Sequence, residues 1–88
     1  KKELKELMLD EELFINVRLK KQTRAAVLSD RRVKDLDLPG ESLITIVRRK
    51  GRILFPHGST LLAEGDELLI IGEKEDIEKI REEYCAPA

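Results

Sequence analysis

Alternation of apolar and polar residues predicts the first strand of the chain. Residues 13–19, LFINVRL, place a large apolar side chain at every second position. Because successive side chains of a strand point to opposite faces, one face of this strand is expected to be fully buried. The expected buried set is Leu13, Ile15, Val17 and Leu19. Phe14, Asn16 and Arg18 are expected on the opposite face.

A short helix is predicted after this strand. Ser29 or Asp30 can cap its beginning, and Val33 and Leu36 lie one turn apart on the same side. The motif LPGES at 38–42 ends the helix, because proline and glycine do not continue it.

Three further strands are predicted in the second half of the chain. Residues 43–47 are apolar and partly β-branched, Gly51 lies in the turn RRKGR, and residues 53–55 return as the second strand of a hairpin. Pro56 ends that strand. Residues 67–71 of the motif EGDELLIIG form a last strand, which is apolar enough to be buried.

Amphipathic helices are predicted at both ends. Their apolar stripes are Leu4, Leu7 and Met8 within residues 1–10 and Ile77, Ile80 and Tyr84 within residues 75–84. We therefore expect an α+β domain at 13–88, with a small sheet of antiparallel hairpins, a short helix after the first strand and a C-terminal helix packed on the sheet. Residues 1–12 are expected to form an N-terminal linker helix.

Composition narrows the class of protein. A chain of 88 residues can bury one modest core, and its 17 basic and 18 acidic residues give a net charge of −1. That balance gives no general attraction to nucleic acid or anionic lipid. No apolar run approaches the roughly 20 residues that span a bilayer, and KKELKELMLD lacks the apolar core of a signal peptide. Because the chain opens on Lys1 rather than methionine, we interpret it as a fragment or a trimmed form, and the native protein as either this domain alone or a longer chain.

No catalytic or metal-binding pattern is present in the sequence. His57 has Ser59 two positions away but no third residue in a recognisable order, and Cys85 is the single cysteine. One histidine and one cysteine far apart do not make a metal site. We interpret His57 as an exposed turn residue, most carboxylates as solvated helix charges, and the protein as not an enzyme.

The motif RRKGR at 48–52 is the densest group of charge. Guanidinium forks match phosphate oxygens, so this hairpin tip could hold a phosphate. The simpler interpretation, a polar hairpin tip, is favoured because no glycine-rich loop leads into a helix here. With no tryptophan, one tyrosine and two phenylalanines, stacking surfaces for nucleic acid are scarce.

The predicted sheet has an edge strand with unpaired backbone groups, which can pair with another strand. The apolar stripe predicted within residues 1–10 has few apolar partners in so short a chain. Both features indicate burial against a second copy or against the remainder of a longer chain.

The ordered motifs between residues 34 and 80 resemble the C-terminal ligand-sensing domain of RCK proteins, the TrkA-C family. The residues that carry the resemblance are Leu36, Leu38 and Pro39 before a strand, Gly51 and Pro56 of the hairpin, Thr60 of the GST turn, and Gly65, Asp66 and Gly72 of the last strand. The likeness extends over residues 13–83.

The resemblance implies a cytoplasmic regulatory domain of a potassium uptake system or channel, held at the inner face of the membrane by a membrane transport protein. Such domains form homodimers and sense a small ligand at the interface. A Rossmann-type nucleotide-binding domain often precedes them, but this chain has no Gly-x-Gly-x-x-Gly motif. The alternatives are a purely structural assembly domain, or the regulatory tail of a cation/proton antiporter or another carrier.

Some family members bind cyclic di-AMP between two such domains, and this resemblance implies a ligand site here. Val33 and His57 occupy matching positions, whereas Lys34 is charged where the family has an apolar residue, and Pro39 also departs from the pattern. The ligand-binding residues that we predict are Val33, Arg48, Arg49 and His57. The sequence itself names no cofactor, effector or transported ion.

Overall fold

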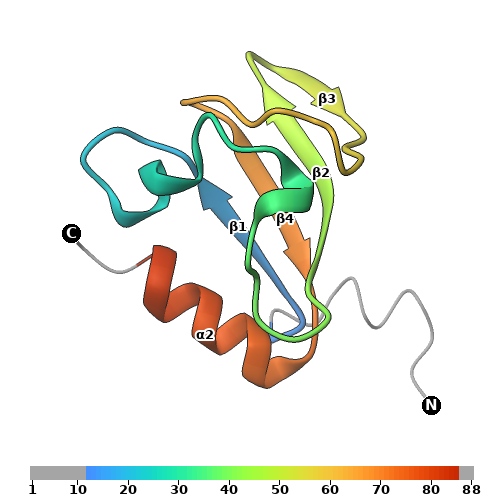
Figure 1. Ribbon diagram of the computed structural model, residues 1–88. Coiled ribbons are helices and arrows are strands. Elements are labelled where there is room, and N and C mark those ends of the chain that lie inside the picture. The colour runs from blue at the N-terminus through green and yellow to red at the C-terminus, as the bar shows by residue number, and fades with distance from the viewer. Residues whose placement is uncertain (1–11, 86–88) are drawn as a thin grey trace.

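A computed structural model describes residues 12–85 of the chain. They form a four-stranded antiparallel sheet of order β1-β4-β2-β3 (Figure 1). The strands are β1 Phe14–Arg18, β2 Leu43–Arg49, β3 Arg52–Leu54 and β4 Glu67–Ile71. The predicted strand pattern is confirmed. The predicted linker helix at 1–12 lies, apart from Glu12, outside the described residues.

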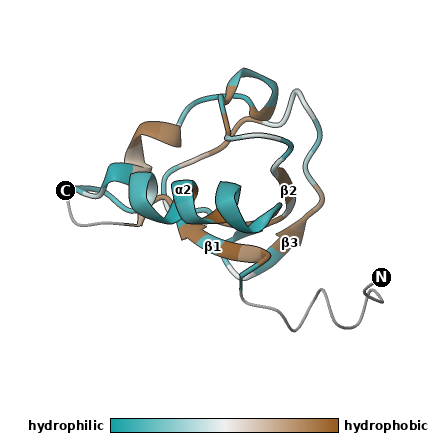
Figure 2. Ribbon diagram, turned by 90° about the horizontal axis from the view of Figure 1, so that it is seen from below, coloured by the Kyte–Doolittle hydropathy of each residue, from teal (hydrophilic) through white to brown (hydrophobic). Residues whose placement is uncertain are grey.

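One helix, α2 (Lys74–Tyr84), packs against the sheet as predicted. Its residues Ile77 and Ile80 are fully buried, and Tyr84 packs at the border of the core. Glu75 and Asp76 stand in its first turn, where the helix dipole favours negative charge. In the described residues α2 lies on one side of the sheet and no helix lies on the other (Figure 2).

The core lies between α2 and the sheet face that it covers, which we call the inner face. Val17, Leu68 and Val47 are cross-strand partners on this face, and each is at most 1% exposed. Ile15, Ile70 and Ile44 form a second such row; the remaining core residues are Leu19, Ala25, Leu28, Leu62, Ile77 and Ile80.

A β-bulge in β2 keeps both of these rows on the inner face. Ile44 pairs with Ile70 and Ile46 with Leu69, so Thr45 is an additional residue on β2. Its hydroxyl donates to the Leu69 carbonyl at 3.0 Å. In a regular strand, residues three positions apart point to opposite faces. The additional residue is what allows Ile44 and Val47 both to point to the inner face.

The connection between β1 and β2 contains two 3-10 turns, η1 (Arg24–Leu28) and η2 (Val33–Asp35). The predicted short helix is thus present as η2, but the prediction of its cap is wrong. Arg32 precedes η2 without a side-chain cap, and Asp30 has a φ of 63°, a left-handed conformation that does not begin a helix. The turn η1, which lies against α2, has no counterpart among the predicted elements.

Candidate functional site

Arg49, one of the predicted ligand residues, points to the inner face and is held there. Its Nε and Nη2 donate to the two carboxylate oxygens of Asp66, each at 2.8 Å, and Nη2 also donates to the Leu61 carbonyl at 2.9 Å. This hydrogen bonding to Asp66 raises the pKa of Arg49. The guanidinium joins β2 to the loop before β4, so its geometry is that of a structural clamp.

Asp66 is a carboxylate that departs from the predicted pattern of solvated charges, because it is fully buried among the described residues. Besides the two bonds from Arg49, its Oδ2 accepts a hydrogen bond from the Ala63 backbone N–H at 2.9 Å. The signal in the sequence is its position directly after Gly65, whose φ of 93° turns the chain into β4.

Arg48 lies on the opposite, outer face of the sheet. It is the cross-strand partner of Glu67, with Nη1 and Oε1 3.9 Å apart, and its side chain is exposed. The turn between β2 and β3 explains why neighbouring arginines separate. Lys50 and Gly51 have φ of 50° and 78°, a tight two-residue turn that lets β2 run on through Arg49.

Val33 and His57 are brought together at one corner beyond β3. The Val33 N–H donates to the Thr60 carbonyl at 3.0 Å, and the Lys34 N–H donates to the Gly58 carbonyl at 2.8 Å. His57 is exposed, and its Nδ1 lies 2.8 Å from the Ser59 hydroxyl. We call residues 33–34 with 57–60 the turn corner.

The outer face is apolar over much of its area. Phe14, Ile71 and Leu43 form one cross-strand row, and Leu69 and Ile46 lie in the next. Leu43 is 59% exposed and Ile71 is 42% exposed. At the β3 edge, Ile53 and Phe55 are also exposed, Phe55 to 79%.

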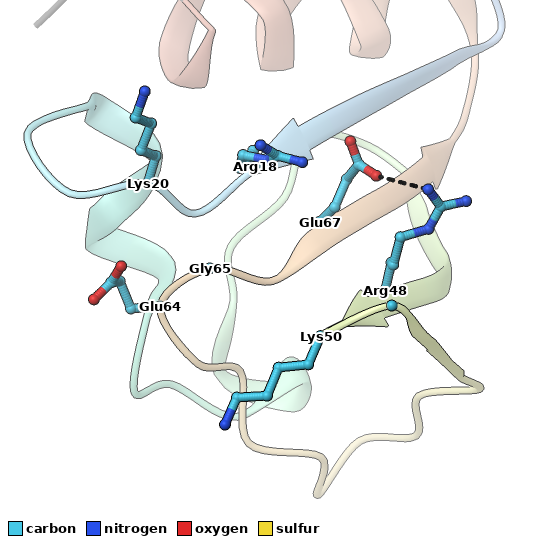
Figure 3. A pocket seen from close by; sticks show the side chains of 8 residues that line it. Arg18, Lys20, Arg48, Lys50, Glu64, Gly65 and Glu67 are labelled. Carbon is cyan, nitrogen blue, oxygen red and sulfur yellow. Dashed lines mark ion pairs between the residues drawn. The ribbon is translucent and has the colours of Figure 1, made fainter.

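Past the apolar rows, the outer face ends in charges that line a pocket of about 370 Å³ (Figure 3). Arg18 of β1 and Arg48 of β2 flank Glu67 of β4 in one cross-strand row. The charged residues lining this basic pocket are Arg18, Lys20, Arg48, Lys50, Glu64 and Glu67. The register of β1 against β4 brings Arg18 here, and Lys20 follows just past the end of β1. No motif in the sequence marks either residue.

The four predicted ligand residues therefore fall in three places: Val33 and His57 at the turn corner, Arg48 in the basic pocket, and Arg49 at the inner clamp. Nothing tests their binding, so that assignment stays a prediction. Within residues 12–85 no group of histidine, cysteine, aspartate and glutamate side chains could hold a metal ion. None of the helices in this range has the length and apolarity to cross a membrane.

Comparison with known sequences gives a family match. The sequence model of the TrkA-C domain family matches residues 23–84. A curated relative, the Trk system potassium uptake protein TrkA homolog of Archaeoglobus fulgidus, is 34% identical over 55 residues, 62% of this chain. The match spans 13% of that relative, so the chain corresponds to a small part of it.

Solved structures share the fold. A structure described as an RCK domain with cda has a TM-score of 0.68 at 19% identity, covering 82% of this chain and 97% of its own. The KtrA RCK C domain in complex with cyclic di-AMP has a TM-score of 0.66 at 20% identity, covering 90% and 92%. The RCK_C domain dimer of S. agalactiae BusR with c-di-AMP has a TM-score of 0.63 at 9% identity, covering 81% and 88%. At these identities the likeness concerns the fold alone.

Proposed function

Because the chain belongs to the TrkA-C domain family, we propose that it is a regulatory domain of a potassium transport system. The family match over residues 23–84 carries this proposal, and the relative named as a potassium uptake protein supports the choice of ion. Transport itself, nucleotide binding in a Rossmann-type domain and attachment to the inner face of the membrane belong to other parts of the system. This chain contributes regulation rather than catalysis.

A homodimer is the working state in this proposal. The outer face supports it, because apolar side chains such as Leu43 and Ile71 are exposed there and no described helix covers that face. In a two-fold dimer the same patch meets itself, which buries these side chains from both copies. The charged row at the pocket end then remains at the rim, where interfaces are polar. One solved structure of the same fold is described as a dimer.

The ligand is sensed at the turn corner. Val33 offers a half-buried apolar side chain, His57 an exposed imidazole on which a base can stack, and Lys34 a charge for a phosphate. Ile53, the cross-strand partner of the outer-face residue Arg48, is exposed and lies four residues before His57, so the corner lies near the proposed dimer interface. The KtrA and BusR domains of the same fold are described with bound cyclic di-AMP, which supports this ligand for the site.

Regulation follows if the ligand binds two dimer geometries unequally. A ligand shifts an equilibrium only by its differential affinity for the two states. A turn corner near the interface meets this condition. Each copy contributes one turn corner, and a movement between the copies changes the distance between the two corners. The chain would then pass the change to the transporter through the segments that join it to the remainder of the protein.

The test is sedimentation and thermal unfolding of this chain with and without cyclic di-AMP, with ATP and NADH as comparison ligands. A dimer whose unfolding midpoint rises with cyclic di-AMP is expected. At a concentration of 100 times the Kd, the ligand adds about 2.7 kcal/mol of stability. His57→Ala should reduce this rise, whereas Lys79→Ala, an exposed change on α2, should not. A dimer indifferent to every ligand favours the purely structural assembly domain, and a monomer overturns the proposed interface.

A further inference from the structure

The basic pocket is separate from the turn corner. It lies on the outer face between the end of β1, the β2–β3 turn and the loop before β4 (Figure 3). None of its lining residues belongs to residues 33–34 or 57–60. Any binding here is therefore a second function, separate from the ligand proposed for the turn corner and located at the rim of the proposed dimer interface.

The pocket carries an excess of positive charge that the described residues do not neutralise. Arg18, Lys20 and Lys50 form no ion pair within residues 12–85. Glu64 forms an ion pair with Lys21, which does not line the pocket; the Lys21 Nζ and Glu64 Oε1 atoms are 3.8 Å apart. Four cations against two carboxylates leave two positive charges in excess, although the whole chain has a net charge of −1.

We propose that the basic pocket binds a small phosphate-bearing ligand with at least two negative charges. Arg18 and Arg48 supply planar donor forks from the two strands that flank β4, and Lys20 and Lys50 supply mobile point charges at the rim. A volume of about 370 Å³ admits a diphosphate or the phosphate end of a nucleotide.

The carboxylates of the pocket select for charge. Glu67 lies between Arg18 and Arg48 and repels an approaching anion, so a single negative charge gains little there. A ligand with several negative charges gains from all four cations, and at 3.9 Å the Arg48–Glu67 contact is loose enough for Arg48 to turn to it. Acetate and chloride are therefore expected to bind weakly, and diphosphate more tightly.

Two-dimensional ¹H–¹⁵N NMR of the chain, titrated with inorganic diphosphate at constant ionic strength, tests the site. Saturable shifts are expected at the amides of Gly51 and Gly65, which lie in open turns lining the pocket. Lys20→Ala combined with Lys50→Ala should weaken binding about 10-fold or more, equivalent to about 1.4 kcal/mol. The matched control removes two exposed lysines of α2, Lys74 and Lys79, which line neither the pocket nor the turn corner.

Two further measurements test the site with a variant that should bind more tightly, which misfolding cannot mimic, and identify the source of the phosphate. Glu64→Gln removes a repelling charge without removing a donor, so it should tighten diphosphate binding about 2- to 3-fold. ATP binding far more tightly than diphosphate assigns a nucleotide, and equal affinities assign free phosphates. Shifts that never saturate, or that both double variants reduce equally, overturn the proposal. Shifts confined to the turn corner overturn it as well and leave the sensor proposal standing.

Discussion

The two faces of the sheet are made of alternate residues of the same strands, but they meet different environments. On the inner face, Val17, Leu68 and Val47 are buried in the core. On the outer face, apolar rows with Leu43 and Ile71 remain exposed and give way to charges. The inner face therefore accounts for the stability of the single chain, and the outer face is the surface that we propose for binding.

The largest expected difference between the faces is in core packing. Leu68→Ala on the inner face should lower the free energy of unfolding by about 2–5 kcal/mol, because it leaves a cavity in the core. Leu69→Ala on the outer face should cost the monomer about 1 kcal/mol or less. Urea unfolding at low protein concentration measures both. Equal losses would show that the outer face is also part of the core.

A second matched pair compares charges. Asp66→Ala leaves Arg49 and the Ala63 N–H without their partner and should cost about 2–3 kcal/mol. Glu67→Ala, one residue later on the other face, removes a 3.9 Å contact between a half-buried carboxylate and the exposed Arg48, and should change stability by about 0.5 kcal/mol or less. Thermal unfolding of both variants measures the two losses of stability. A comparable loss for Glu67→Ala would contradict the distinction between clamp and surface contact.

The outer face should control assembly without controlling folding. Ile71→Asp is expected to weaken the dimer about 100-fold or more, because it places a charge in the apolar patch. Val27→Asp, at a residue 60% exposed on η1, is the control for an added surface carboxylate. Sedimentation equilibrium measures the dissociation constant, and circular dichroism verifies the fold. An unchanged dimer would place the interface elsewhere.

The smallest effect concerns Tyr84 at the border of the inner face. Burial, reinforced by the neighbouring Glu83, raises the pKa of Tyr84 to about 12. The unfolded chain loses this proton near pH 10, so it binds fewer protons than the folded chain between about pH 10 and 12. Stability should therefore fall across that window. Because Tyr84 is the single tyrosine, its absorbance reports the titration directly. The stability of Tyr84→Phe should fall less steeply, and a titration near pH 10 in the folded chain would contradict the expectation.

Most of the fold can be predicted because its signals are local. The alternation at 13–19, the apolar strand at 67–71 and the stripe of Ile77 and Ile80 each reflect burial on one face, and the structure confirms them. The predicted cap at Ser29 or Asp30 is wrong because hydrogen bonds to Thr60 and Gly58, far along the chain, fix η2. The capping preferences of Ser29 and Asp30 reflect neighbouring residues only, so they do not predict hydrogen bonds to residues far along the chain.

The candidate sites are less predictable because they depend on register. The motif RRKGR is one cluster of charge along the sequence, but alternation sends Arg48 and Arg49 to opposite faces. Conversely, Arg18 and Arg48 are far apart in the sequence and stand in one row only because β4 pairs with both β1 and β2. A charge count along the sequence does not include this pairing.

The bulge at Thr45 has a consequence for changes in chain length. Because of the bulge, Ile44 points to the inner face and Ile46 to the outer face. Removing Thr45 would therefore leave a regular strand in which every remaining side chain points to the same face as before. A protein one residue shorter at this point would thus retain the sealed core, the clamp and the exposed patch together. We therefore expect β2 to tolerate deletion of Thr45. In a strand with regular pairing throughout, the same deletion would move every following side chain to the opposite face.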